Sequence, residues 1–262
     1  MIDRTDVHNA MVRTFAGRSL LDDDDRAAIH ALPFLLREVR PSAYIVDEGA
    51  DPTRCAFLFD GFSFRQRLTN RGARQILSIQ IPGEFVDLQN LHLKRSDHSV
   101  QALTRAIIAE VPLSAMRQLA LSRPSISNAM WIEALVEASM FREWIMNVGR
   151  RNALVRVAHI ICEFTARLEA AGVSVHDGYL LPMTQEQLGD AVGLTAVHVN
   201  RTLRRLHELG LVERDGYHIV ISDRKGLRAA AGFRADYLHL DQNERSATGA
   251  PVQATLSRPF LN

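Results

Sequence analysis

The clearest hydrophobic pattern lies in the last third of the chain. Val199, Leu203 and Leu206 recur at helical spacing, so they form an apolar stripe along one side of a helix. A shorter amphipathic run begins at Thr184 and ends at Gly193, where a glycine can take a positive φ and turn the chain sharply. The pattern predicts two helices joined by a tight turn, which is the helix-turn-helix arrangement.

Capping residues and a hairpin signal support this interpretation. Thr184 has Gln187 three residues later, which is the spacing of a capping box, and Thr195 precedes the second helix. Further on, Asp215 and Gly216 are a typical tight hairpin turn. The apolar residues around that turn are Val212, Tyr217, Ile219 and Ile221. The sequence therefore predicts a β-wing beside the two helices.

The first half of the chain shows a different pattern between residues 34 and 112. Short apolar runs cover residues 43–49, 54–61, 62–68, 73–81 and 100–111. Turn signals between them lie at Glu48-Gly49, Asp60-Gly61, Asn70-Arg71-Gly72 and Pro82-Gly83. Strands spaced this regularly predict an all-β sandwich or barrel.

A long helix is predicted between the two halves, over residues 126–148. Three heptad registers fit it: Ile132, Val136, Ser139 and Met146; Trp131, Leu135, Ala138 and Ile145; or Met130, Ala134, Phe141 and Val148. A helix that is apolar nearly all round is buried on more than one side, which favours packing against its own β-domain and against a second copy. Burial wholly within one monomer is the alternative. We expect a hinge at residues 147–151 and a helix beneath the second helix at residues 152–170.

Two further segments are predicted near the ends of the chain. Four aspartates at residues 22–25 lead an apolar-periodic run, residues 20–35, and carboxylates stabilise a helix N-terminus. A metal site is the alternative, but adjacent side chains on a helix point in different directions. Near the other end, Phe233, Tyr237 and Leu240 predict an anchor after a closing helix. Residues 241–262 lack periodicity, and we expect them to be disordered.

Composition and charge limit the classes of function. The chain has 262 residues, 47% of them hydrophobic, which suits one or two globular domains. The net charge is only +1, but residues 193–228 hold seven basic and four acidic residues, so any DNA affinity is local. Cys55 and Cys162 cannot form a disulfide framework, and the sequence begins without an apolar secretion signal. No run approaches the roughly 18 apolar residues of a membrane span. We expect a cytoplasmic protein without a membrane partner.

The outward face of the second predicted helix suits the DNA major groove. Arg201 can bond bidentately to guanine O6 and N7, and Asn200 can pair with adenine N6 and N7. A methyl group of Val197 can contact the methyl group of thymine. An ordinary helical hairpin with solvated arginines is the alternative interpretation. The caps, the turn, the apolar stripe and the wing together favour double-stranded DNA as the partner.

The segment MTQEQLGDAVGLTAVHVNRTLRRLHELGLVERD resembles the DNA-binding half of the Crp/Fnr superfamily of bacterial transcription regulators. We assign DNA contacts to Thr184, Thr195, Ala196, Val197, His198, Asn200, Arg201, Arg204, Arg205 and Arg214. The best-known members carry a glutamate at the position of Val197. A glutamate accepts a hydrogen bond from cytosine N4, whereas a valine packs on a methyl group. We therefore expect a half-site that differs from the familiar TGTGA and TTGAT.

The resemblance implies an α+β fold, with an N-terminal double-stranded β-helix, or jelly roll, as the sensor domain. The runs at residues 57–61 and 81–85 occupy characteristic places of this cyclic-nucleotide-binding type of domain. The expected domains are residues 1–124 for the jelly roll, 125–151 for a dimerisation helix and hinge, 152–240 for a winged helix-turn-helix, and 241–262 for the tail. The family implies a homodimer without catalytic activity that binds a near-palindromic promoter site and activates RNA polymerase.

An effector pocket in the jelly roll would involve Asp87, Leu88, Arg95, His98 and Ser99. No Gly-Glu pair follows Phe85, and His98 stands where the family's phosphate-binding arginine is expected. A neutral imidazole cannot replace a guanidinium fork against a phosphate. An Arg95-Ser96 pair shifted along the chain is the alternative. We expect that cyclic AMP is not a tight ligand.

No cofactor or metal is assigned from the sequence. An iron–sulfur cluster generally needs four cysteine ligands, and this chain has two. Haem ligation by His92 or His98 stays open, and Cys55 is either a redox thiol or a small buried hydrophobe. The effector is therefore unidentified or absent. Two rival functions remain, a cupin-like metal-dependent enzyme and an architectural DNA-binding protein that works without an effector.

Overall fold

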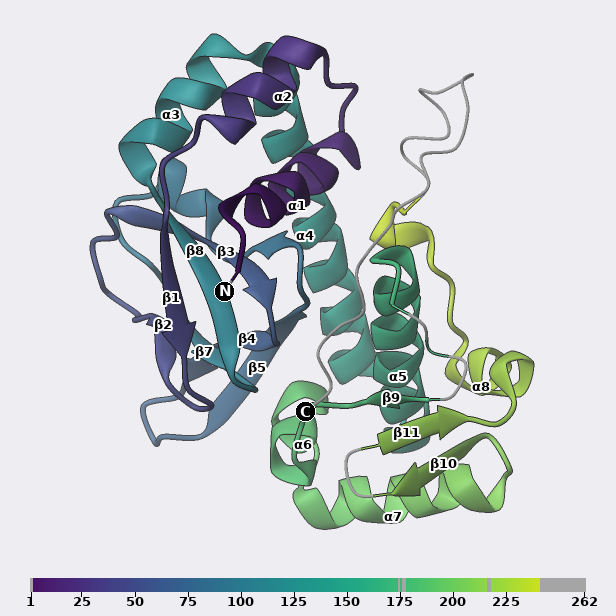
Figure 1. Ribbon diagram of the computed structural model, residues 1–262. Helices are drawn as coiled ribbons and strands as arrows, with labels where there is room; N and C mark the ends of the chain where they lie inside the picture. Colours follow the sequence, from purple (N-terminus) through teal and green to yellow (C-terminus); the bar gives the residue numbers. More distant parts are fainter. Residues whose placement is uncertain (1, 174, 176–177, 216–217, 241–262) are drawn as a thin grey trace. The chain divides into compact units, whose positions relative to one another are not determined.

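The computed structural model describes residues 2–173, 175, 178–215 and 218–240 (Figure 1). The chain divides into two units, one built mainly from residues 1–67 and 79–138 and the other from residues 68–78 and 139–239. The division falls inside the longest helix, between Ala138 and Ser139. The predicted domain limits at residues 124 and 151 lie on either side of it.

Two four-stranded sheets are formed by the first half of the chain, in the orders β1-β8-β3-β6 and β2-β7-β4-β5. The strands are β1 (Leu35–Val39), β2 (Tyr44–Val46), β3 (Arg54–Asp60), β4 (Ser63–Leu68), β5 (Arg74–Gln80), β6 (Glu84–Phe85), β7 (Ser99–Ala102) and β8 (Ala106–Pro112), with a 3-10 turn η1 (Leu88–Leu91). This arrangement confirms the predicted jelly roll. The run predicted as one strand at residues 100–111 is two strands, because the chain bends at residues 103–105.

Strand β3 shows why its sequence is apolar without interruption. Cys55 and Phe57 belong to a cluster packed against helices, whereas Ala56 and Leu58 belong to a second cluster that includes Val100 of the other sheet. Successive side chains of a strand point to opposite faces, so both faces of β3 are buried. Burial of the larger side chains among them, Phe57 and Leu58, contributes about 1.5 to 3 kcal/mol each.

Three helices lie together at one end of the sheets, α1 (Arg4–Ala16), α2 (Asp23–His30) and α3 (Leu113–Ser122) (Figure 1). The hydrophobic pattern of the sequence does not predict α1. Its carboxylate cap is Asp3, which accepts a hydrogen bond from the Thr5 backbone. Met11 and Phe15 are fully buried, and Phe15 stacks on Phe85 at 5.1 Å between ring centroids. The helix therefore forms through its contacts with the sheet rather than through a strong stripe of its own.

The aspartates at residues 22–25 lie at the N-terminus of α2, which confirms the predicted role in helix capping. Asp22 accepts a hydrogen bond from the Asp25 backbone at 2.7 Å, and Asp25 accepts one from the Asp22 backbone at 3.1 Å. Arg123 pairs with both carboxylates, each at 2.7 Å. The helix ends at His30 and β1 starts at Leu35, so it is shorter than the predicted run.

Helix α4 (Pro124–Arg150) contains most of the segment predicted as a hinge. Residues 147–150 are helical, and only Arg151 separates α4 from Asn152, the cap of the next helix. The long helix therefore runs two residues beyond its predicted end at Val148, and the hinge at residues 147–151 stays a prediction. Gly149 costs a helix only about 1 kcal/mol relative to alanine, which the flanking turns tolerate. Ile126 and Ala129, in the first turns of α4, are buried in the same cluster as Cys55 and Phe57, which we call the helix-side core.

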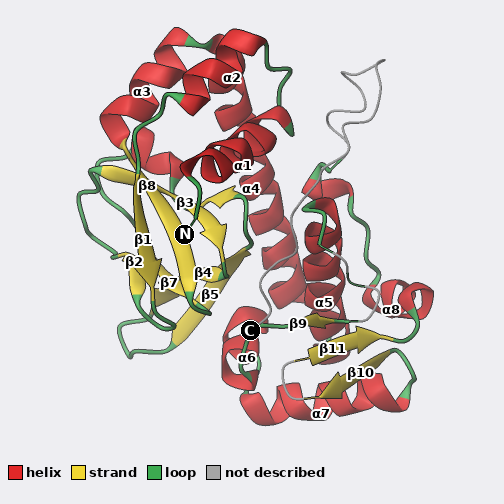
Figure 2. Cartoon of the chain, in the orientation of Figure 1, coloured by secondary structure: helices red, strands yellow, loops and turns green. Residues whose placement is uncertain are grey.

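The C-terminal unit joins four helices to a three-stranded sheet of order β10-β11-β9 (Figure 2). Its elements are α5 (Ala153–Ala170), β9 (Tyr179–Leu180), α6 (Gln185–Val192), α7 (Ala196–Glu208), β10 (Val212–Asp215), β11 (His218–Ile221), α8 (Arg224–Ala231) and the 3-10 turn η2 (Asp236–Leu238). Helix α5 contacts α6, α7 and α8 and is buried from Val157 to Leu168. This confirms the helix predicted beneath the second helix of the motif.

The closing segment differs in one residue from its prediction. Phe233 and Tyr237 both contact the His159 ring, at 5.2 and 5.8 Å between ring centroids. However, Leu238 is buried and Leu240 is exposed, so Leu240 is not part of the anchor. Helix α8 ends at the left-handed Gly232, and the 3-10 turn that follows changes which side chains face inward. The predicted disordered tail, residues 241–262, lies outside the described residues.

Candidate nucleic-acid interface

The predicted helix-turn-helix is formed by α6 and α7. The Thr184 hydroxyl accepts a hydrogen bond from the Gln187 backbone at 3.1 Å, and the Gln187 side chain accepts one from the Thr184 backbone at 2.9 Å. Gly193 ends α6 with a φ of 67°. A Cβ at Gly189 would lie 2.4 Å from the Leu194 carbonyl oxygen, so the close approach of helix and turn also requires a glycine. These features confirm the predicted motif and fix the angle at which α7 leaves the turn.

Helix α7 is the recognition helix of this motif, and its two faces differ as predicted. The Thr195 hydroxyl caps it by accepting a hydrogen bond from the His198 backbone at 3.3 Å. Val199, Leu203 and Leu206 are buried. On the other face the side chain of Val197 is 81% exposed. Because the apolar stripe is anchored in the core, the outward face is presented in one orientation.

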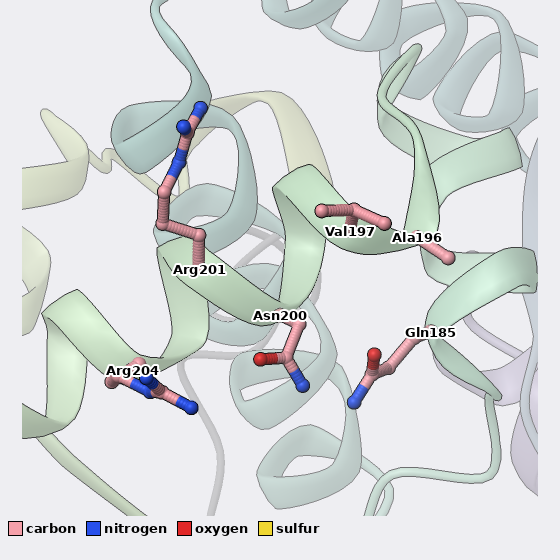
Figure 3. A pocket seen from close by; sticks show the side chains of 6 residues that line it. All are labelled: Gln185, Ala196, Val197, Asn200, Arg201 and Arg204. Atoms are coloured by element: carbon pink, nitrogen blue, oxygen red, sulfur yellow. The ribbon is translucent and has the colours of Figure 1, made fainter.

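A shallow hollow opens on this outward face. It is lined by Gln185, Ala196, Val197, Asn200, Arg201 and Arg204 (Figure 3). Figure 3 shows the side chains of Asn200, Arg204 and Gln185 directed to one side of α7, while that of Arg201 points the other way. Within the described residues, Gln185, Asn200, Arg201 and Arg204 make no side-chain hydrogen bond or ion pair. Two amides and two guanidinium groups are therefore free to bind an external partner.

The other residues assigned to DNA lie around this hollow. Thr184 and Thr195 are exposed at the starts of α6 and α7, and His198 is partly exposed. Arg205 pairs with Glu208 at 3.2 Å, so part of its charge is already compensated. Arg214 lies on β10, and its side chain falls outside the described residues. Gln185 was not predicted; its place directly after the cap of α6, before a glycine turn to α7, is the signal that could have found it.

The wing is formed by β10 and β11. The strands pair antiparallel, with Val212 opposite Ile221 and Asp215 opposite His218. The residues that connect them, Gly216 and Tyr217, lie outside the described residues, so the predicted turn type stays a prediction. Ile219 is fully buried and joins the wing to the core of the unit.

A buried carboxylate joins α5 to α4 and to the closing segment. Glu163 on α5 accepts hydrogen bonds from Trp144 Nε1 at 3.0 and 3.1 Å and from the Tyr237 hydroxyl at 2.7 Å. Arg167, one turn along α5, lies 3.7 Å away. Burial raises the pKa of Glu163, and the charge of Arg167 opposes this rise. The carboxylate thus links α4, α5 and the closing segment.

The residues predicted for an effector pocket do not share one set of contacts. Asp87 is buried and accepts hydrogen bonds from the Ala56 backbone at 2.9 Å and from Cys55 Sγ at 3.2 Å. Leu88 is buried in the helix-side core, and Arg95 is exposed. Ser99 accepts a hydrogen bond from the Glu48 backbone at 3.0 Å. The polar groups of Asp87, His98 and Ser99 therefore already make hydrogen bonds within the domain.

His98 is held by a residue that the sequence did not point to, Arg65. The Arg65 Nε donates a hydrogen bond to His98 Nε2 at 2.8 Å, and His98 Nδ1 lies 2.7 Å from Asp97. Arg65 also donates to the Val86 carbonyl at 2.7 Å and pairs with Glu137 on α4. Burial, followed by the charge of Arg65, lowers the pKa of His98. The polar centre of the jelly roll is therefore an internal network that reaches α4.

Replacing Asp87 by asparagine tests the cost of that buried carboxyl. Burial raises the pKa of Asp87 to about 6, above its ordinary value of 3.8. A raised folded-state pKa means that the stability is full below about pH 4 and is lost as the pH rises through about 6. From pH 4 to pH 7, urea denaturation should show Asp87→Asn gaining about 2 kcal/mol relative to the parent protein. A difference independent of pH would contradict this.

The remaining cofactor hypotheses find little support among these side chains. Cys55 donates its S–H to Asp87, and burial raises its pKa well above the ordinary value, so the thiolate that redox sensing requires is disfavoured. His92 is exposed and stacks with Trp131 at 5.9 Å, whereas His98 is buried. Among the described residues there is no cluster of three potential metal ligands. Nor does any described helix combine the length and apolar character that crossing a membrane demands.

Two family models match the chain. One, described as a Crp-like helix-turn-helix domain, matches residues 155–230, and the other, a cyclic nucleotide-binding domain, matches residues 36–123. Electron transport regulator A of Shewanella oneidensis is 25% identical over 71% of this chain and 74% of its own length. Transcriptional activator protein FnrA of Stutzerimonas stutzeri is 27% identical over 64% of this chain and 69% of its own length.

A solved structure shares the arrangement of these elements. FixK2 from Bradyrhizobium japonicum matches with a TM-score of 0.72 and 24% identity, over 78% of this chain and 100% of that chain. At this identity the likeness concerns the fold. It agrees with the two domains that the family models identify.

Proposed function

Because this chain belongs to the Crp/Fnr superfamily of DNA-binding transcription regulators, we propose that it binds promoter DNA as a homodimer and activates transcription there. Helix α7 enters the major groove, and β10 and β11 lie beside it. One observation carries the proposal: a capped helix anchored in the core presents an amide and two guanidinium groups that have no partner within the described residues.

The chemistry of this face suits base edges. Arg201 is the guanine reader, Asn200 is an adenine reader, and Val197 contacts a thymine methyl group. Arg204 and the exposed hydroxyls of Thr184 and Thr195 contact phosphates, which set the register without reading the sequence. Since no glutamate stands at the position of Val197, cytosine is not selected there.

An unpaired apolar face on α4 suits a second copy of the chain. Trp131, Leu135, Ile145 and Met146 are all exposed on this helix. Three of them belong to one of the registers considered from the sequence, and in a 27-residue helix they lie along one side. Facing a symmetric partner, the same side chains would be buried in an isologous interface. Two recognition helices would then read half-sites about one duplex turn apart.

Introducing a charge on this face should separate the dimer. Leu135→Glu places a carboxylate where the side chain is 62% exposed in the single chain and buried in the proposed dimer. The dissociation constant measured by sedimentation equilibrium should rise at least about tenfold, because an unpaired buried charge is costly. Leu121→Glu on α3, at a site that is 87% exposed, is the matched control and should leave it unchanged. A parent protein that is monomeric at micromolar concentration would contradict the dimer.

We propose that the jelly roll does not require a cyclic nucleotide. The nitrogens of the buried Arg65 guanidinium are directed to His98, Glu137 and the Val86 carbonyl. A phosphate would have to displace these partners, and the exposed Arg95 offers no enclosed site. Any other effector of the domain stays unidentified.

The same proposal includes three further points. The protein contacts RNA polymerase, it is located in the cytoplasm, and it is not an enzyme. A cupin-like enzyme is not favoured, since the described residues hold no metal-ligand cluster. An architectural role is distinguished by in vitro transcription from a promoter that carries the bound site. Added protein should increase transcript from that promoter and not from one with a scrambled site. Equal transcription from both would refute activation.

A further inference from the structure

Gln185 lines the hollow from a different element than the other five residues. It is the first residue of α6, while Ala196, Val197, Asn200, Arg201 and Arg204 all belong to α7. Figure 3 shows its side-chain amide close beside that of Asn200, both directed to the same side of α7. Among the described residues the amide has no partner. The proposed contacts of α7 do not account for it.

Resting on the proposed DNA binding, we infer that Gln185 is a specificity-determining residue that reads an adenine next to the base pair contacted by Asn200. A carboxamide offers one acceptor and one donor side by side, which match adenine N6 and N7 in the major groove. A phosphate group accepts hydrogen bonds and uses only the donor. Gln185 also carries no charge, so it adds nothing to the counterion release that drives phosphate contacts.

The neighbouring Val197 suits the same kind of base pair. In an A·T pair the adenine N6 and N7 and the thymine methyl group all face the major groove. Val197 presents methyl groups at the hollow, and its side chain is 81% exposed. Gln185, Val197 and Asn200 together therefore fit a short run of A·T pairs, with the guanine of Arg201 beside it.

The position of Gln185 is fixed by its surroundings. The residue before it, Thr184, is held by the reciprocal bonds with Gln187. Helix α6 approaches the turn so closely at Gly189 that no Cβ fits there, which locks α6 against the start of α7. Because its backbone is held in this way, Gln185 loses little conformational freedom when it binds DNA. This is what a residue that reads a nucleobase requires.

The test uses modified DNA and the full chain. In the half-site selected by the parent protein, each adenine in turn is replaced by 7-deazaadenine, which removes N7 and leaves the phosphates unchanged. At one of these adenines, the replacement should lower the DNA affinity of the parent protein about 5- to 10-fold. The same replacement should leave the DNA affinity of the Gln185→Ala variant unchanged. Asn200→Ala should lose sensitivity at a neighbouring adenine instead. Glu186→Ala, an exposed neighbour outside the hollow, is the control and should keep the parent's sensitivities.

The outcomes separate this inference from the proposed function. If Gln185→Ala weakens binding by the same factor on every duplex, including random sequence, Gln185 is a phosphate contact and the inference is wrong. It is also wrong if Gln185→Ala keeps every sensitivity of the parent. A parent protein that prefers no duplex sequence at all would overturn the proposed function itself, before any substitution is made.

Discussion

Arg201→Ala is expected to weaken binding to the selected operator by about 1 to 3 kcal/mol, roughly 5- to 150-fold, and to relax selection at one base pair of each half-site. Arg201 is exposed on α7, and its guanidinium makes no ion pair with any described residue. A planar group with several donors can bond both acceptors of a guanine at once. Removing it therefore removes recognition of one base as well as affinity.

The comparison that decides the role of Arg201 is binding to operator and to random duplex. Affinity for random duplex should change much less than affinity for the operator, as measured by fluorescence anisotropy at one salt concentration. Arg205→Ala is the matched control, because this guanidinium on the same helix pairs with Glu208. It should cause a small loss that is equal for both duplexes. Equal losses for Arg201→Ala would make Arg201 a phosphate contact.

Glu163→Ala should lower the free energy of unfolding of the C-terminal unit by about 3 to 5 kcal/mol. The side chain is 2% exposed and accepts hydrogen bonds from Trp144 and Tyr237. Removing the carboxylate leaves the Trp144 Nε1–H and the Tyr237 hydroxyl without an acceptor. It also leaves the Arg167 guanidinium without this nearby negative charge. Urea denaturation followed by the fluorescence of Trp144, in a Trp131→Phe background, measures this change.

The control for this prediction is Glu163→Gln. A glutamine keeps an acceptor oxygen for the two donors but has no charge, so its loss should be clearly smaller than that of the alanine variant. A loss below about 1 kcal/mol for Glu163→Ala would show that the carboxylate does not hold α4, α5 and the closing segment together. Operator affinity of the folded fraction should stay unchanged, since Glu163 is buried away from the hollow.

The recognition motif could be predicted because its signals are local. A threonine cap, a glycine turn and a stripe at helical spacing each follow from residues within a few positions of one another, and Thr184, Gly193 and Leu203 behave as predicted. The strands of the jelly roll follow from the same kind of local pattern, short apolar runs between turn signals. Helix α1 and strand β6 could not be predicted this way, because they depend on contacts such as that of Phe15 with Phe85.

The errors have physical causes of the same kind. The helix of α4 continues through Gly149 because one glycine does not outweigh the turns around it. Leu238 is buried in the anchor in place of Leu240, because the 3-10 turn at Asp236–Leu238 changes which side chains face inward. Arg65 was missed as the partner of His98, since their contact joins strand β4 to the bend before β7 and is not visible in the spacing. Gln185 was missed because it belongs to α6, and its place beside the outward face of α7 depends on how the two helices pack.

The central claim, that α7 reads base edges of double-stranded DNA, is tested most directly by selection from a pool of random duplexes with the purified full chain. We predict an enriched near-palindromic site whose half-sites lie about one duplex turn apart, each with a guanine beside A·T pairs. Enrichment of no sequence over competitor duplex, with and without added cell extract, would contradict the account.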